Sequence, residues 1–425
     1  MPLPGTAPTP APPPTGSPTA NRTAITYAFW ITMAGTTVPT PLYPLYQQAF
    51  GFSPLMITVI FAVYAVGVVA GLLAFGRLSD QIGRRPVIAL ALLLAGLAAG
   101  MFLAADGLGW MLPARVLTGF SAALVTGSAT AALLDLAAPE HRARAQSLAI
   151  GANMGGLACG TLLSGVLAQW ASSPLRLPWL VTLALTAVAA VGLALLPKGG
   201  PRASGLSLRP QALRVPAAIR PAFLRAALAA GSGFAVLGVL TSVTGLFLAR
   251  VLHLEDPALT GLVVFLAFAC TAVGQFAARA LRPGRALPAA CGGLVLAAAL
   301  IAVALLSRSL APLLAGACVD GLATGAAVGD GLGVINAGTP RQHRGEVVST
   351  FFAVLYAMLS VPVIGVGVLI QVSGLRTAGV TFSALVAALA VAVAVSLLRG
   401  PRDGGSPGGG APGGGAVRGA PRSER

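Results

Sequence analysis

Charged residues are scarce in this chain, and acidic residues are the scarcest of them. Only 9% of the 425 residues are charged, and 11 Asp and Glu stand against 27 Lys and Arg. The three histidines, His141, His253 and His343, fall in expected loops and form no metal-ligand spacing with the four cysteines. The sequence also lacks a nucleophile motif. We therefore expect no cofactor, no metal site and no enzymatic activity.

Apolar residues dominate the chain instead. They make up 56% of it, and the mean hydropathy of +0.86 lies well beyond the balance of a soluble domain. A run of about 20 apolar residues crosses roughly 30 Å of hydrocarbon. Because the runs are continuous, and a bilayer offers no water to backbone groups, they predict helices rather than barrel strands. The twelve predicted spans are residues 25–46, 55–75, 87–106, 110–134, 146–168, 177–196, 224–248, 259–279, 287–306, 310–334, 348–370 and 377–398.

The distribution of arginine predicts the orientation in the bilayer. Cytoplasmic loops of membrane proteins carry an excess of Arg and Lys. Here most basic residues fall in alternate loops and in the tails, while the loops of the other side hold only Arg176, Arg250, Arg308 and Arg376. We expect a multi-pass protein of a bacterial inner membrane with both termini in the cytoplasm. This topology accounts for the net charge of +16, and without aromatic interleaving the basic residues predict no nucleic-acid partner.

Composition and an internal repeat divide the chain into two halves. We expect disordered cytoplasmic tails over 1–21 and 400–425, six-helix bundles over 22–197 and 223–399, and a cytoplasmic linker over 198–222. A shift of 202 residues superimposes one loop on another, because it brings His141, Arg142 and Ser147 onto His343, Arg344 and Ser349. Two homologous bundles imply a pseudo-twofold axis along the membrane normal, with a solute site between them near the midplane.

A short charged turn joins the second and third predicted spans. It reads Gly76-Arg77-Leu78-Ser79-Asp80-Gln81-Ile82-Gly83-Arg84-Arg85-Pro86. This order resembles the G-x-L-x-D-x-x-G-R-R/K loop of the major facilitator superfamily, whose members move small solutes by alternating access. The resemblance covers residues 22–399. It implies an all-α integral membrane fold with twelve transmembrane helices in two pseudo-symmetric six-helix bundles.

The resemblance also implies a gate at this turn. Asp80 would lock against a helix of the other bundle when the carrier faces outward, and Arg84 would reach Asp135 at the inner end of the fourth helix. An Arg between two carboxylates forms an interaction that can break and form again. The alternative is a simple basic turn of the cytoplasmic side. The residues of the implied gate are Gly76 and Gly83, which would allow a tight turn, with Asp80, Arg84, Arg85 and Asp135.

Three ionisable residues inside predicted spans are candidates for proton coupling or substrate binding. Arg115 begins the segment Arg115-Val116-Leu117-Thr118-Gly119, which resembles a family motif linked to proton or substrate handling. An Arg in hydrocarbon is costly, so it should face a wet cavity or a partner, although its shallow position also permits snorkelling. Asp320 and Asp330 lie about 80° apart around one helix and about 15 Å apart in depth, so both can line one cavity face. Asp320 suits reversible protonation or pairing with a cationic solute, whereas Asp330 can instead be a solvated residue near the helix end.

Weaker signals come from the first, fifth and seventh spans. Residues 151–160 resemble the G-x-x-x-G-P-x-x-G-G motif of antiporters, but Gly156 replaces the proline and Cys159 replaces a glycine. Small residues at this spacing also serve helix packing. Three prolines, Pro39, Pro41 and Pro44, predict a kink in the first span. The expected cavity-lining residues are Thr36, Thr40, Tyr43, Asn153, Thr241 and Thr244.

Taken with the resemblance, these features predict a secondary active transporter that acts as a monomer. We expect it to export a small, fairly apolar or cationic molecule in exchange for protons. Two alternatives stay open: a proton-coupled importer of a small metabolite, and a non-transporting sensor or membrane enzyme built on the same fold.

Overall fold

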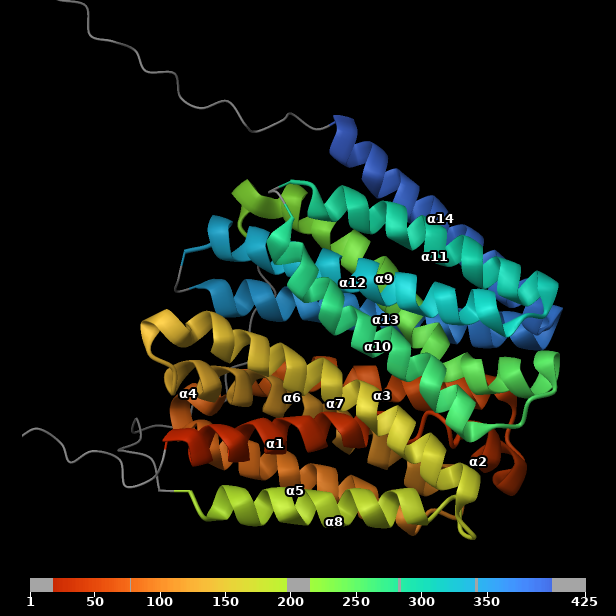
Figure 1. Cartoon of the computed structure of the whole chain (residues 1–425), viewed down its shortest axis with the longest axis horizontal. Coiled ribbons are helices and arrows are strands. Elements are labelled where there is room, and N and C mark those ends of the chain that lie inside the picture. Colours follow the sequence, from red (N-terminus) through yellow and green to blue (C-terminus); the bar gives the residue numbers. More distant parts are fainter. Residues whose placement is uncertain (1–17, 77, 197–214, 282–283, 341–342, 400–425) are drawn as a thin grey trace, which may run out of the picture.

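The computed structural model describes residues 18–76, 78–196, 215–281, 284–340 and 343–399, and every regular element in these ranges is a helix (Figure 1). The twelve long helices are α1 (Pro18–Thr37), α3 (Pro54–Phe75), α5 (Arg84–Leu103), α6 (Leu108–Asp135), α7 (Arg142–Trp170), α8 (Leu177–Ala194), α9 (Arg220–Phe247), α10 (Pro257–Ala280), α11 (Ala286–Ser307), α12 (Leu310–Gly338), α13 (Arg344–Ser373) and α14 (Leu375–Arg399). The short elements are α2 (Tyr43–Phe50), α4 (Leu78–Ile82), two 3-10 turns (Pro139–His141 and Ala217–Ile219) and a π-helical turn (Leu248–Leu252). The predicted all-α fold is confirmed.

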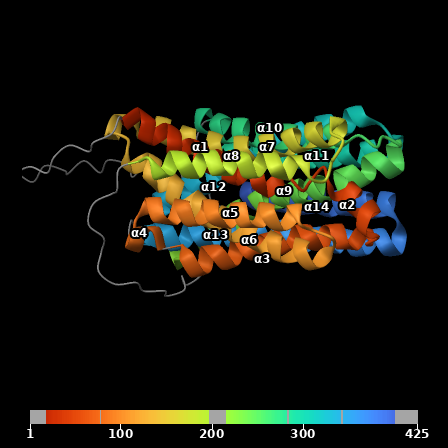
Figure 2. The same ribbon diagram turned by 90° about the horizontal axis from the view of Figure 1, so that it is seen from below.

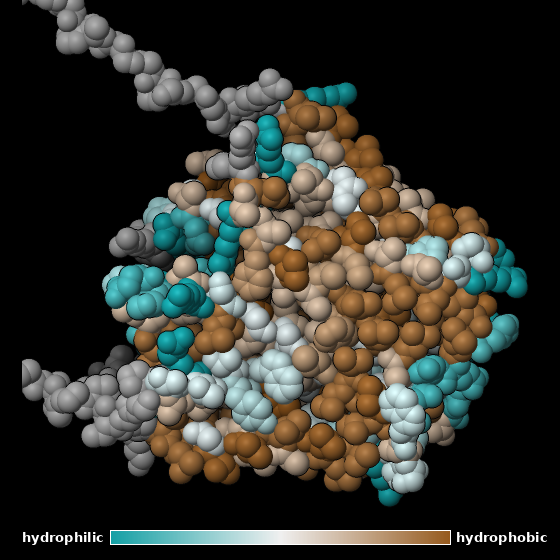
Figure 3. Space-filling view, in the orientation of Figure 1, coloured by the Kyte–Doolittle hydropathy of each residue, from teal (hydrophilic) through white to brown (hydrophobic). Residues whose placement is uncertain are grey.

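The surface of the helical body is that of a membrane protein. Eleven of the described helices are long and apolar enough to cross a bilayer. Figure 3 shows apolar side chains in a broad band across the middle of the molecule and polar side chains at its two ends. Leu93, Val188 and Leu385 are each more than half exposed. Large apolar side chains in such numbers would be unfavourable in water but not in lipid. The chain is a multi-pass integral membrane protein.

The internal repeat is visible in the helix boundaries. A shift of 202 residues carries Arg84, where α5 begins, onto Ala286, where α11 begins. The same shift carries Leu108 at the start of α6 onto Leu310 at the start of α12. The starts of α1 and α9, and those of α7 and α13, obey the same shift. The two halves therefore repeat one six-helix arrangement, as the sequence predicts.

The halves lie side by side, and the helices of both run between the same two ends of the molecule. The bundle from α1 to α8 and the bundle from α9 to α14 are separate in Figure 1, and Figure 2 shows the helices running between the end at which α4 lies and the end at which α2 lies. We call these the α4 end and the α2 end. The main contacts between the halves are those of α3 with α13 and of α7 with α10. Because successive long helices alternate in direction, the chain enters α1 and leaves α14 at the α4 end.

The first span differs from its prediction. A single kinked helix over 25–46 was expected, but α1 ends at Thr37 and α2 begins only at Tyr43. Prolines at 39, 41 and 44 cannot donate backbone hydrogen bonds, and a turn replaces the helix, with Thr40 N donating to Thr37 O at 3.0 Å. The threonines, Asn21 and Arg22 also keep α1 from being apolar enough to count among the eleven spanning helices. Together with these eleven, α1 makes up the twelve long helices, and it packs against α6, α7 and α8.

Several predicted segments lie outside the described residues. They are 1–17 of the predicted tail 1–21, 198–214 of the predicted linker 198–222, and the whole tail 400–425. Where the chain is described, both bundles begin a little earlier than predicted, with α1 at Pro18 and α9 at Arg220. Proline is favoured in the first turn of a helix, and each helix has one there.

Candidate functional site

A cavity of about 380 Å³ lies between the two bundles. Its wall includes Ser79 and Gln146 from the amino-terminal half and Leu332 and Ser349 from the other half. All four lie near the α4 end of the molecule, so the cavity opens toward that end. A smaller chamber of about 80 Å³ continues it between the helices and reaches Arg115. We call the two together the central cavity.

At the α2 end the two halves touch. The Thr161 hydroxyl of α7 donates to the carbonyl oxygen of Gly261 on α10 at 3.1 Å. A Cβ added to Gly261 would lie 2.5 Å from the carbonyl oxygen of Thr161, so only glycine permits this approach. A Cβ at Gly367 on α13 would likewise lie 2.1 Å from the hydroxyl of Thr58 on α3. These contacts hold the two halves together at the α2 end, whereas the residues that line the central cavity reach the α4 end.

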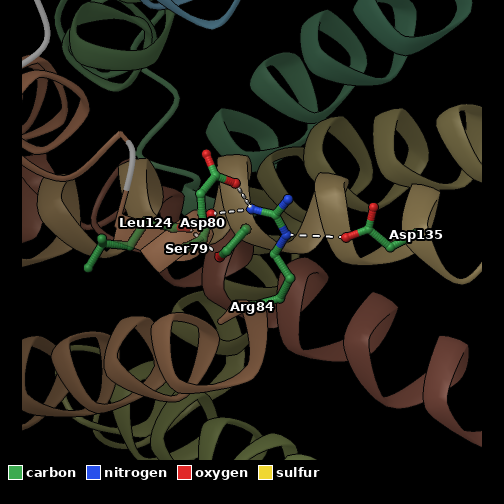
Figure 4. Close-up of polar contacts among 6 residues, drawn as sticks. Ser79, Asp80, Arg84, Leu124 and Asp135 are labelled. Atoms are coloured by element: carbon green, nitrogen blue, oxygen red, sulfur yellow. Dashed lines mark hydrogen bonds and ion pairs between the residues drawn. The ribbon is translucent and has the colours of Figure 1, made fainter. Parts of the chain in front are cut away.

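The charged turn brings the predicted gate residues together. Arg84 lies between Asp80 and Asp135, as Figure 4 shows. Its Nε donates to Asp135 Oδ2 at 3.3 Å, and its Nη1 donates to Ser79 Oγ at 2.7 Å and to Asp80 Oδ1. The predicted contact between Arg84 and Asp135 is confirmed. All of these residues belong to the amino-terminal half, so the expected contact of Asp80 with the other half stays a prediction.

The other residues of the turn have different structural tasks. Gly83 has a φ of 94°, a conformation that favours glycine, and it allows α5 to start directly after α4. Gly76 does not need to be glycine for the turn, because its φ of −57° is ordinary helical geometry. It lines the mouth of the cavity instead. Arg85 donates from Nη2 to the carbonyl oxygen of Ala194 at 2.8 Å, where α8 ends and carbonyls lack helical partners.

Arg115 does not snorkel to the surface. Its side chain is 2% exposed, and it lines the deep chamber. The guanidinium donates from Nη1 to Thr36 O at 2.7 Å and from Nε to Ile60 O at 3.3 Å. It also lies over the ring of Tyr64, with 4.7 Å between Cζ and the ring centroid. The structure therefore supports the interpretation in which Arg115 faces a cavity and polar partners, and not the one in which it reaches the surface.

The two aspartates of α12 lie apart from the central cavity. Neither is among the residues that line its two chambers. Val328 and Leu332 of the same helix do line it. An α-helix turns by about 100° per residue, so Asp330 lies about 200° around the helix from Val328 and points to the opposite side. Asp320 is fully buried on the flank of α12 next to Thr324, which packs against Gly233 of α9. The expectation that both acids share the cavity wall is wrong, because their rotation around the helix places them elsewhere.

Half of the predicted lining residues line the central cavity. They are Thr36, Asn153 and Thr241. Thr40 and Tyr43 are buried where α1 breaks, and Tyr43 packs in an apolar cluster with Phe102 and Trp179. Thr244 lines a separate apolar pocket of about 50 Å³ inside the carboxy-terminal half. A polar residue in a span is therefore not by itself evidence for the transport path.

The glycines of the antiporter-like segment pack helices. A Cβ at Gly156 would lie 2.4 Å from the carbonyl oxygen of Trp30, and one at Gly160 would lie 2.2 Å from that of Ala34. Both contacts join α7 to α1 within the amino-terminal half. Close packing of helices, the alternative to an antiporter motif, therefore explains why Gly156 and Gly160 are glycines.

Several lining residues were not identified from the sequence. Tyr64 of α3 and Tyr356 of α13 meet edge to face across the two halves, with 6.3 Å between ring centroids. Phe234 of α9 lies 6.1 Å from Tyr356. Aromatic residues in apolar runs carry no sequence signal for a cavity. Gln275, which also lines it, is an uncharged amide inside a span and could have been found by the criterion that selected Asn153.

Comparison with known proteins agrees with the architecture. An inner membrane transport protein of Escherichia coli strain K12, YnfM, is 32% identical over 126 residues, which is 30% of this chain and 30% of that protein. A bacterial homologue of the human lysosomal transporter Spinster, solved in an inward-facing and occupied conformation, matches with a TM-score of 0.70 at 17% identity over 91% of this chain and 98% of that one. The human organic anion transporter MFSD10 matches with a TM-score of 0.63 at 18% identity over 90% of this chain and 100% of that one. These structural likenesses show the fold.

A sequence model described as the Major Facilitator Superfamily matches residues 25–361, and the chain thus belongs to that family of membrane transporters.

Proposed function

We propose that the protein is a secondary active transporter of a bacterial inner membrane, which moves a small molecule by alternating access. The observation that carries this proposal is the central cavity between the two halves, which extends to the α4 end while the halves touch at the α2 end. A carrier needs a site that is reachable from one side at a time, between two bundles that can rock against each other. The arginine distribution supports assigning the α4 end to the cytoplasm, so that both termini are cytoplasmic.

The direction we propose is efflux. A mostly apolar cavity that opens to the cytoplasm would accept apolar molecules from inside the cell. Protons are the proposed coupling ion, because Asp320 is fully buried and its Oδ2 has no hydrogen-bond partner among the described residues. An isolated carboxylate is costly to bury, and protonation removes that cost. The aspartate would thus gain and lose a proton as its surroundings change, without touching the substrate.

The ion pairs of Arg84 supply the proposed gate. In the observed arrangement Arg84 is held by two carboxylates of its own half. Closure of the α4 end would bring the carboxy-terminal half onto this turn, and Asp80 would exchange its partner. Both carboxylates are more than half exposed, so each pair contributes only about 1 kcal/mol or less, and such weak pairs suit a gate that must open and close.

A transport assay in proteoliposomes tests the proposal. Vesicles loaded with a candidate solute are diluted into a trace of its labelled form, and counterflow is followed with and without a pH step. A carrier shows transient accumulation of specific solutes, whereas a sensor or an enzyme shows none for any solute of a broad panel. Accumulation driven by an interior more acidic than the bath supports proton exchange, and indifference to the pH step contradicts it.

A further inference from the structure

The central cavity contains an unbalanced positive charge. Among the described residues that line its two chambers, Arg115 is the one ionised side chain. Its hydrogen-bond partners, Thr36 O and Ile60 O, are neutral carbonyl groups, and it forms no ion pair with any described residue. A buried charge without a counterion is unfavourable, and carbonyl dipoles with an aromatic ring offset only part of the cost.

The guanidinium also has unused donor capacity. An arginine carries five N–H donors in a planar fork, and the structure uses Nη1 and Nε. The Nη2 group makes no hydrogen bond with any described residue, although the side chain lines the deep chamber. Nearby, the buried Oδ1 end of the Asn153 side chain also lacks a hydrogen-bond partner in the described chain. Two polar side chains from α6 and α7 are therefore incompletely satisfied in one cavity.

The rest of the described cavity wall is uncharged and mostly apolar. Leu72, Met154, Phe234 and Phe352 line both chambers, and Val328, Leu332 and Val348 continue the wall toward the α4 end. Asp320 and Asp330 are not among the described residues that line this space, so its wall presents one fixed positive charge and no negative charge. A ligand that matches this arrangement has an apolar body toward the open end and a negative group at the deep end.

We propose that the transported molecule is an amphipathic organic anion whose negative group pairs with Arg115. This deepens the function proposed above and rests on it. A carboxylate or sulfonate would accept hydrogen bonds from the free edge of the guanidinium, and such charge-assisted pairs are about twice as strong as neutral ones. The sequence suggests a fairly apolar or cationic solute, but a cationic solute would pair with an acid, and no acid is among the described residues that line the cavity.

Direct binding to the purified full chain tests the charge of the ligand. The probes are matched series of C8 to C12 alkanoates and arylacetates, each with its uncharged amide and its amine of the same skeleton. For skeletons that fit, the anion should bind at least tenfold more tightly than the amide, and the amine should bind most weakly. If no skeleton shows an anion preference in the wild-type protein, the proposal is overturned.

A substitution then assigns the preference to one residue. Arg115→Gln should remove the difference between anion and amide, while Arg176→Gln, an exposed arginine of the α2 end, should leave it unchanged. Retention of the anion preference in Arg115→Gln would also overturn the proposal. If that variant does not fold, the wild-type comparison decides alone. Counterflow separates this inference from the proposed function. Anion binding without counterflow of any probe contradicts transport. Counterflow of the amide or amine, but not of the anion, contradicts an anionic ligand.

Discussion

The guanidinium of Arg115 donates a hydrogen bond to the carbonyl oxygen of Thr36, in the last turn of α1, at 2.7 Å. The last carbonyls of a helix have no partners within it, and a cation there interacts favourably with the helix dipole. Arg115 thus ties α6 to the point at which the first span breaks, and its bond to Ile60 ties both to α3. One side chain stabilises the deep end of the cavity and provides its charge.

Arg115→Lys separates these two roles. A lysine keeps the charge but lacks the planar fork, so it cannot reproduce both backbone hydrogen bonds. We expect each lost bond of this charged group to cost about 1.5–3 kcal/mol, and the melting temperature in detergent to fall. The preference for anions should remain. An unchanged melting temperature would show that these bonds do not hold the break in α1.

A charge reversal tests the gate. Arg84→Asp and Asp135→Arg should each reduce the transport rate by about tenfold or more, because each places like charges side by side; a tenfold loss corresponds to about 1.4 kcal/mol. The double variant restores an opposite pair and should recover part of the rate, measured at equal membrane abundance. Purely additive losses would mean that the two residues are not coupled.

Two glycines of α7 provide a matched packing test. Ala in place of Gly160 would put a Cβ 2.2 Å from the carbonyl oxygen of Ala34, whereas Gly151 has nothing within 4 Å of such an atom. We expect Gly160→Ala to destabilise the fold by about 1–3 kcal/mol, as overpacking does. Gly151→Ala should be neutral or slightly stabilising, since Ala favours helices. Thermal unfolding of the two variants in one detergent compares them, and equal melting temperatures would exclude the close contact between α7 and α1.

The sequence predicted the parts of this fold that depend on local pattern. Length and hydropathy found the helices, and the loop repeat of His141 and His343 predicted a shift that four of the six pairs of helix starts obey. The contact between Arg84 and Asp135 followed from the resemblance. The directions of Asp320 and Thr244 could not be predicted in this way, because a helix with apolar residues on all sides carries no signal for its rotation about its own axis. That rotation is set by packing against α9 and its neighbours.

Proton coupling through Asp320 is tested by Asp320→Asn, which is permanently neutral at this position. We expect accumulation driven by a pH step to vanish while exchange of solute across the vesicle membrane continues. A hundredfold proton gradient is equivalent to about 2.7 kcal/mol, enough to concentrate an exchanged solute about a hundredfold, so the loss would be large. Asp330→Asn is the control, because Asp330 lies on the same helix but is only partly buried, and this variant should still accumulate solute. Accumulation by Asp320→Asn would contradict the assignment.

Paired distance measurements would show whether the two halves alternate in opening the cavity between them. After replacement of the four cysteines, spin labels at Glu140→Cys and Gly345→Cys report on the α4 end, and labels at Gly109→Cys and Arg308→Cys report on the α2 end; all four positions are exposed. Electron–electron resonance in lipid nanodiscs would follow both pairs at low and high pH, with and without a bound amphipathic anion. We expect two populations, in which a shorter distance at the α4 end accompanies a longer distance at the α2 end. Distances that stay constant at both ends, or that lengthen and shorten together, would contradict it.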